Sequence, residues 1–166
     1  MDKKQIIQAM ERNMFIIKNK LLENVNLRKL LFYSKPDALA LTEPLASDIE
    51  KYIDLTSVVH YGQNPQNQIN SFIVVNLNES DLSDFTQSIH GIGVSLFCNH
   101  SSLLLDNNRL RHFAIAQEIV TTLGSTILLS AGKMELINME LKILNEDYVG
   151  FELEFIAIDS TEVDNF

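Results

Sequence analysis

The stretch KMELINMELKIL-NED-YVGFELEFIAI, residues 133–158, decides how this chain folds. Apolar and polar residues alternate on both sides of the short polar segment Asn145–Asp147, and a period of two residues is typical of β-strands. The stretch therefore predicts a β-hairpin with strands over Lys133–Leu144 and Tyr148–Ile158 and with one face on the core. That apolar face comprises Ile137, Met139, Leu141, Ile143, Val149, Phe151, Leu153, Phe155 and Ala157.

Two more strands precede the hairpin. Ser71–Leu77 and Ile92–His100 are rich in apolar, β-branched and aromatic residues, and the near-continuous apolarity of the first predicts burial on both faces. The connection between them, Asn78–His90, has no helical pattern, which favours antiparallel pairing of the two strands. We therefore expect a small, mainly antiparallel sheet of about four strands.

A long helix is predicted over Asn107–Leu123, with Asp106 or Asn107 as its N-cap and Gly124 at its end. We expect this helix to cover the hairpin, because a helix and a sheet can share one core layer. The expected core contacts join Phe113 and Ile119 of the helix to Leu141, Phe151, Leu153 and Phe155. The residues expected to face mostly outward are Arg109, Arg111, His112, Gln117 and Glu118.

Helices also open the chain. Apolar residues spaced by three and four predict a helix over Lys3–Leu22, and Asn26 is the expected N-cap of a second helix, Leu27–Tyr33. Asp37–Asn70 shows little regular pattern beyond one helical turn at Asp48–Tyr52, and loops of this length usually serve a function. The fold class is therefore α+β, a sheet flanked by helices with an extra N-terminal helical segment.

Charge divides the chain unevenly. Residues 1–35 contain eight Lys or Arg against three Asp or Glu, a balance of +5, whereas residues 36–166 contain five against nineteen, a balance of −14. We distinguish a basic N-terminal helical segment (1–35), an α+β domain (36–159) and an acidic flexible tail (160–166). An acidic domain repels nucleic acid. The basic segment is therefore expected to be a solvated helix face or to dock on an acidic surface, in the same chain or in a neighbouring copy.

The sequence also indicates a compartment. A single cysteine, Cys98, cannot form an internal disulfide, which fits a reducing cytoplasm. No apolar run approaches the length of a membrane span, and the charged N-terminus has no signal-peptide pattern.

No set of residues in the sequence indicates catalysis. Cys98 and His100 would point to the same side of a strand, yet a cysteine in an apolar strand is more often plain core. The four histidines lack the spacing of metal ligands. Carboxylates of the hairpin could converge on one face, as glycosidase and divalent-metal sites require, although a solvated or subunit-facing surface explains them more simply. They are Glu135, Glu140, Glu152 and Glu154.

A series of short motifs occurs in order along the chain. LRKLLFYS at 27–34 is followed by PDAL at 36–39 and EPL at 43–45, and a polar loop with Pro65 leads into SFIVV at 71–75. GVSLFCNH at 93–100 then leads into NNRLR at 107–111 and IAQEI at 115–119, and the hairpin at 136–158 completes the series. The series resembles the tail-completion and neck proteins of tailed bacteriophages, small virion proteins that form rings at the head–tail joint.

The resemblance implies a small antiparallel sheet flanked by helices, assembly into a ring, commonly of six copies, and neither cofactor nor catalysis. It implies a structural virion protein, a tail terminator or neck connector, that completes the tail and lets DNA pass without specific binding. Its partners would be its own copies, the tail-tube protein and neck or connector proteins, with assembly in the host cytoplasm and no membrane. The alternative is a cellular adaptor or immunity-type protein-binding module with a similar layered fold.

The uneven charge suggests how such a ring would form. The basic segment of one copy is expected to dock on the acidic surface of the next, and acidic residues are expected to line the channel. The candidate interface residues are Lys3, Lys4, Arg12, Lys18, Lys20, Arg28, Lys29, Glu135, Glu140, Glu152 and Glu154.

Overall fold

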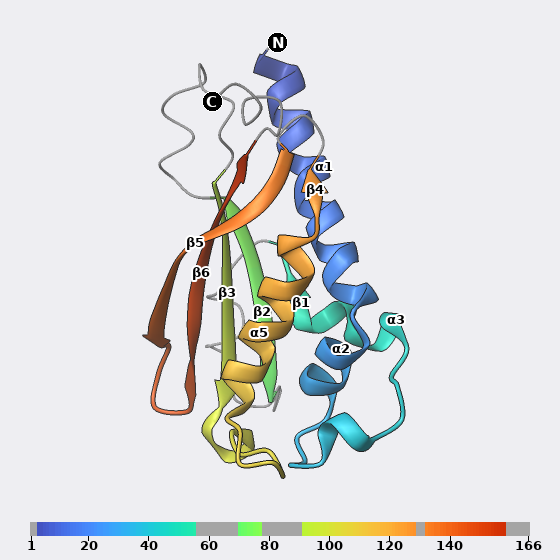
Figure 1. Ribbon diagram of the computed structural model, residues 1–166, viewed down its shortest axis with the longest axis vertical. Coiled ribbons are helices and arrows are strands. Elements are labelled where there is room, and N and C mark those ends of the chain that lie inside the picture. Colours follow the sequence, from blue (N-terminus) through green and yellow to red (C-terminus); the bar gives the residue numbers. More distant parts are fainter. Residues whose placement is uncertain (1–2, 56–69, 78–90, 129–131, 159–166) are drawn as a thin grey trace, which may run out of the picture.

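The computed structural model describes residues 3–55, 70–77, 91–128 and 132–158 and has an α+β fold (Figure 1). The expectations for part of the Asp37–Asn70 loop, for the connection Asn78–His90 and for the tail at 160–166 lie outside the described residues.

The sheet has six strands in the order β1-β2-β3-β6-β5-β4. Its four long strands are β2 (Ser71–Leu77), β3 (Gly91–Asn99), β5 (Gly132–Ile143) and β6 (Tyr148–Ile158). They pair antiparallel, as predicted. The two edges carry the two-residue strands β1 (Ile53–Asp54), which is parallel to β2, and β4 (Ile127–Leu128). Strands this short have no periodic pattern, so the prediction of about four strands missed them.

Helices α1 (Lys3–Glu23), α2 (Val25–Phe32) and α5 (Arg111–Gly124) form a layer on one face of the sheet (Figure 1). The short helix α3 (Ala46–Ile49) and a 3₁₀ turn at Glu50–Tyr52 occupy the predicted helical turn. Further 3₁₀ turns lie at Ala38–Ala40 and His100–Ser102.

The main core lies between the helical layer and the sheet. Ile17 and Leu21 of α1, Leu30 of α2 and Ile119 of α5 are completely buried against the sheet, so all three helices share this core. The sheet contributes Ile73, Val75, Ile92, Val94, Leu96, Cys98, Phe151, Leu153 and Phe155. A second, smaller cluster of Phe72, Val74 and Phe97 lies on the opposite face of the sheet. The prediction that β2 is buried on both faces is therefore confirmed.

Two predicted helix starts were wrong. Helix α2 is capped by Asn24, whose side-chain oxygen accepts the N–H of Leu27 at 2.9 Å, and not by Asn26. Helix α5 begins at Arg111 instead of Asn107, because Asn108 takes a left-handed φ of 58° that a helix cannot accommodate. The four residues before α5 instead form a loop, in which Leu110 is bridged to Leu104.

The outward positions predicted for α5 were also partly wrong. Arg111 is completely buried, and His112 is 5% exposed. The Arg111 guanidinium donates to the main-chain oxygens of Ser102, Leu30, Tyr33 and Lys35 at 2.6–2.8 Å. These bonds tie the start of α5 to the end of α2, where the last carbonyls of a helix lack intrahelical partners.

A β-bulge in β5 changes the predicted alternation. Leu136 lies opposite Phe155 and Asn138 lies opposite Glu154, so Ile137 is an extra residue in the strand. Leu136 consequently takes the place on the core-side face that Ile137 was predicted to hold. Met139, Leu141 and Ile143 share that face, as expected.

Candidate assembly surface

Strand β5 has an open outer edge along most of its length. Strand β4 pairs only with Gly132 and Lys133, and the N–H of Met134 donates to the main-chain oxygen of Thr126. No other described strand pairs with this edge between Glu135 and Ile143. In Figure 1 this strand begins near α1 and β4, and its second half runs along the side of the sheet away from α1 and α2. An exposed edge of this length can template pairing with another strand.

The core-side face of β5 extends past the cover of α5 and is exposed. Met139 is 48%, Leu141 55% and Ile143 73% exposed, so the prediction that Leu141 belongs to the core was wrong. Leu136 and Ile137 of the same strand are also exposed, as is Phe113 of α5. We call the six residues Phe113, Leu136, Ile137, Met139, Leu141 and Ile143 the apolar strip.

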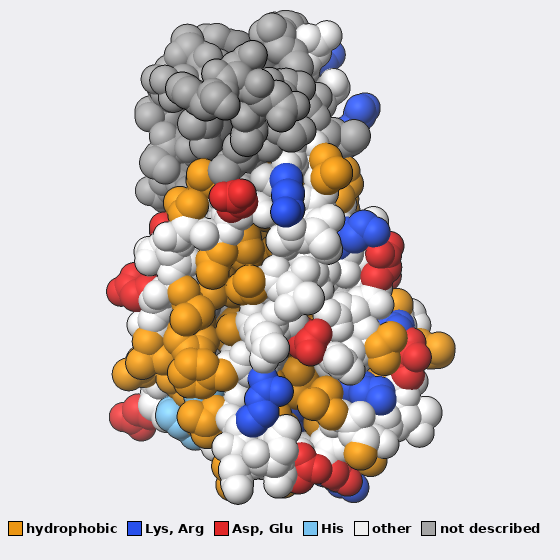
Figure 2. All heavy atoms as spheres, viewed as in Figure 1, with side chains coloured by type: hydrophobic (Ala, Val, Ile, Leu, Met, Phe, Trp, Pro, Cys, Tyr) orange, Lys and Arg blue, Asp and Glu red, His pale blue; other side chains and the backbone are white. Residues whose placement is uncertain are grey.

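Figure 2 shows hydrophobic side chains gathered over this side of the molecule. From the exposed fractions, the strip presents on the order of 500 Å² of apolar surface, and patches this large on single-chain proteins are often functional.

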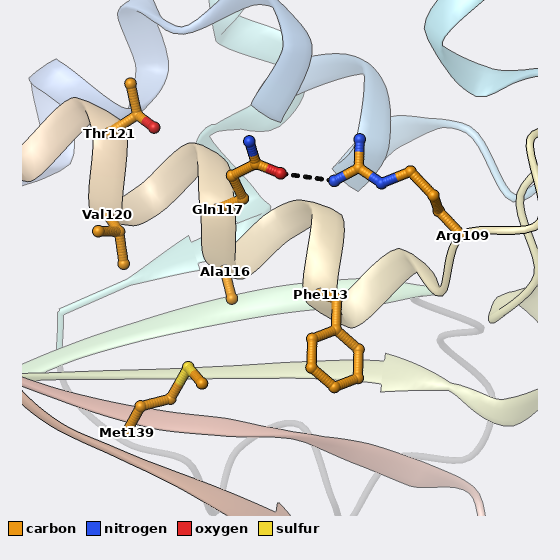
Figure 3. Close-up of a pocket in the computed structure, with 7 residues that line it drawn as sticks. All are labelled: Arg109, Phe113, Ala116, Gln117, Val120, Thr121 and Met139. Atoms are coloured by element: carbon orange, nitrogen blue, oxygen red, sulfur yellow. Dashed lines mark hydrogen bonds between the residues drawn. The ribbon is translucent and has the colours of Figure 1, made fainter.

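A shallow groove of about 440 Å³ runs between α5 and Met139 of β5. Figure 3 shows Phe113 pointing from α5 toward the sheet and Met139 pointing from the sheet toward α5, at different places along the groove, while Arg109 donates to Gln117 at 2.6 Å. Phe113 packs edge-on to Phe151, with 4.9 Å between ring centroids, but is itself 49% exposed. It therefore forms one wall of the groove instead of the fully buried contact that its helical position predicted.

The four candidate carboxylates share the face of the sheet that points away from α5. Glu140 lies opposite Glu152, Glu154 lies opposite Asn138, and Glu135 lies opposite Ile156. In a regular strand Glu135 and Glu140 would point to opposite faces, so the bulge brings them together.

Lys142 neutralises part of this acidic face. Its ammonium donates to Glu140 at 2.8 Å and contacts Glu152 at 3.2 Å, and these hydrogen bonds raise the pKa of Lys142. Glu140 and Glu152 therefore belong to a salt-bridge cluster with Lys142, whereas Glu154 accepts a hydrogen bond from Asn138 at 3.4 Å. No group of three or more potential metal ligands occurs among the described residues.

The basic candidates lie on the helical layer, across the sheet from the carboxylates. Lys4, Arg12 and Lys20 are exposed, and Lys20 pairs with Glu23 in the same helix. Lys3 and Lys18 belong to the same helix, α1. Arg28 already pairs with Glu43 of the same chain, and Lys29 donates to the main-chain oxygen of Leu39.

The residues considered for chemistry are separated. Cys98 points into the core, where burial raises the pKa of its thiol to about 12, and Ser71 donates a hydrogen bond to its sulfur. His100 lies in an exposed turn, outside that core. Within the described residues no helix is long and apolar enough to cross a membrane.

The apolar strip is the feature that sequence reasoning missed. The period of two identified an apolar face on β5 but gave no information about what covers it. One sequence signal was available: the adjacent apolar pair Leu136-Ile137 interrupts the alternation and marks the bulge.

Neither the curated proteins nor the solved structures contain a match to this chain. A family model does match, over residues 24–156, from the N-cap of α2 into β6, with α1 outside the matched range. The match covers most of the chain, which therefore belongs to YomW, a protein family of Bacillus phage regions.

Proposed function

We propose that this chain is a structural protein of a tailed phage that acts by assembly, forming a ring at the head–tail joint as a tail terminator or neck connector. The observation that carries the proposal is the separation of charge across the layers. Exposed lysines and an arginine of α1 lie on the helical side, and Glu135, Glu140, Glu152 and Glu154 lie on the opposite side of the sheet.

Opposite charges on opposite sides favour a head-to-tail contact between copies. The α1 side of one copy is complementary to the acidic sheet face of the next, and each copy uses both surfaces. Contacts of this heterologous type close into a ring when the rotation per copy permits. Acidic groups left on the channel side would repel DNA, so that it slides through the ring without sticking.

Two findings support a phage setting for this assembly. The family is one of phage regions, and the order of motifs resembles tail-completion and neck proteins. In this proposal the partners are other copies, the tail-tube protein and a neck or connector ring, the location is the virion, and no cofactor takes part.

The first test is assembly of the purified protein. Its mass in solution, measured alone and with tail-tube protein, should exceed that of one chain, and electron microscopy should show rings. Added salt should shift the population to smaller species, because exposed charge pairs are screened within about 8–10 Å at ordinary ionic strength.

Charge reversal locates the contact. Arg12→Glu with Lys18→Glu on α1 should abolish rings, whereas Lys35→Glu with Arg109→Glu changes the net charge equally, away from both α1 and the acidic sheet face, and should preserve them. If both pairs of substitutions act alike, net charge matters and the α1 contact is wrong.

The second test is genetic. Phage lacking the protein should accumulate unjoined heads and tails, or tails of uncontrolled length. Normal infectious particles would refute the virion role and leave the adaptor or immunity-type module as the better account.

A further inference from the structure

Strand β5 presents hydrogen-bonding groups on its open edge in a defined pattern. Leu144 donates its main-chain N–H to the oxygen of Tyr148, in the hairpin. Because main-chain groups of successive strand residues alternate in direction, those of Lys142 and Glu140 also face β6. The N–H and C=O groups of Met139, Leu141 and Ile143 therefore face outward.

The bulge limits how much of this edge can pair. Ile137 interrupts the regular ladder, so the regular stretch of the edge runs from Asn138 to Leu144. In this stretch Met139, Leu141 and Ile143 lie on one face, and Asn138, Glu140 and Lys142 lie on the other.

We propose that a second copy of this chain caps the edge, through antiparallel pairing of the two β5 strands about a twofold axis at Leu141. Leu141 then lies opposite its own equivalent, Met139 lies opposite Ile143, and Glu140 lies opposite Lys142, twice by symmetry. The apolar strips of the two copies become one continuous surface, and each acidic residue of the pair meets a lysine.

Charge complementarity selects this register. Moving the axis by one residue in either direction places Glu140 opposite Glu140 or Lys142 opposite Lys142, and like charges directly opposite are destabilising. Axes between residues would place apolar side chains opposite polar ones across the sheet. Among these axes, only the one at Leu141 matches both faces over 139–143.

The backbone pattern suits the same register. The pairs Met139–Ile143, Leu141–Leu141 and Ile143–Met139 are the hydrogen-bonded ones, at two bonds each, so about six main-chain bonds form. Glu140 and Lys142 fall on the non-hydrogen-bonded positions, where side chains approach most closely. The two strips together form one apolar surface on the order of 1,000 Å², while the contact itself is held by the main-chain bonds and by the cross-strand pairs of Met139, Leu141 and Ile143.

This contact goes beyond the ring proposal and does not require it, although Glu140 belongs to both surfaces. It uses the β5 edge and leaves the exposed basic residues of α1 accessible for head-to-tail contacts. A dimer without rings would refute the ring alone, and rings without the β5 contact would refute the dimer alone.

Charge-swap variants test the pairing. Glu140→Lys alone places two lysines against each other in both symmetric pairs, and Lys142→Glu alone places two carboxylates against each other. In sedimentation velocity, each variant should dimerise at least tenfold more weakly than the unaltered chain. Mixed one to one, the two variants should form a heterodimer, because every pair then joins opposite charges. A mixture that stays as monomeric as its components overturns the register.

Cysteine cross-linking tests the axis independently of charge. Leu141→Cys should give a disulfide-linked dimer on oxidation, because hydrogen-bonded partners lie about 5.5 Å apart at Cα, within disulfide range. Met139→Cys is the matched control and should not link to itself, since its equivalents are displaced by four residues, about 14 Å. The native Cys98 is buried and does not compete. Equal linking of both variants, or an unaltered chain that stays monomeric at about 100 µM, overturns the proposal.

Discussion

Replacing the buried Arg111 is expected to weaken the fold more than any nearby surface change. Its guanidinium is inaccessible to solvent and donates four hydrogen bonds to main-chain oxygens, which join α2, the loop after it and the turn before α5. Burial lowers the pKa of Arg111, but a guanidinium keeps its proton at any ordinary pH. The charge is balanced by carbonyl dipoles at the C-terminal end of α2.

The size of the effect follows from those carbonyls. Arg111→Met keeps much of the apolar stem and removes every donor. The oxygen of Lys35 still accepts from the N–H of Ala38, so three carbonyls suffer most: those of Ser102, Leu30 and Tyr33. Each carbonyl left without its donor costs about 1–2 kcal/mol of the free energy of unfolding. Part of this cost is offset because the variant no longer buries a charge, so the net loss of stability is about 3–5 kcal/mol. Arg111→Lys keeps the charge without the planar fork and should lose about half as much.

Urea unfolding followed by circular dichroism measures this loss directly. The matched control is Arg109→Met, two residues earlier, where the exposed side chain bonds only Gln117 among the described contacts. That variant should stay within about 0.5 kcal/mol of the unaltered chain. An Arg111→Met protein equally close to it would show that the four hydrogen bonds contribute nothing net, and the reasoning would be wrong.

Three further expectations concern stability. Burial, and then the charge of His100, lower the pKa of His112 below its ordinary 6.5. The contribution of neutral His112 to stability should therefore be complete above pH 6.5 and fall as the pH drops below it. In His112→Gln, the free energy of unfolding measured in urea should change less between pH 7 and pH 5 than in the unaltered chain. In thermal unfolding, Gly150→Ala should lose at least about 3 kcal/mol of stability, or not fold at all, because its Cβ would overlap the main chain of Leu96. Gly124→Ala is the control, and it should be neutral or stabilising because no atom lies near its Cβ. Phe113→Ala should cost about 1–2 kcal/mol in the same assay, since half the ring is already exposed; a loss of 4 kcal/mol would contradict this.

Local patterns predicted the long elements and failed where tertiary contacts decide. Helix α1 and strands β2 and β6 lie where apolar spacing placed them. Arg111 was expected outward because arginine is rarely buried, although it falls on the same helical stripe as Ile115, Ile119 and Leu123. Its partners are carbonyls some eighty residues away in α2 and the loop after it, and no local pattern reports such contacts.

The candidate surface shows the same division. The alternation in β5 correctly identified an apolar and a charged face from Asn138 to Ile143, but Glu135 reaches the charged face only because of the bulge. Whether the apolar face is covered depends on the length and position of α5, whose fourteen residues span about 21 Å and leave the β5 end of the sheet bare. Sequence periodicity can identify a face, but its cover is a property of the whole fold.

The two proposed contacts should differ in their response to salt, and this difference can order them in assembly. The contact between α1 and the acidic face is built from exposed charges, which are individually worth little and are screened by salt. The β5 contact rests mainly on main-chain hydrogen bonds and on lateral contacts between apolar cross-strand side chains, which salt does not weaken in this way. A salt titration should therefore dissolve rings first and leave dimers, whose apolar edge stays protected from uncontrolled strand pairing. If dimers disappear before rings, the edge contact depends on the ring, and the order of assembly is the reverse.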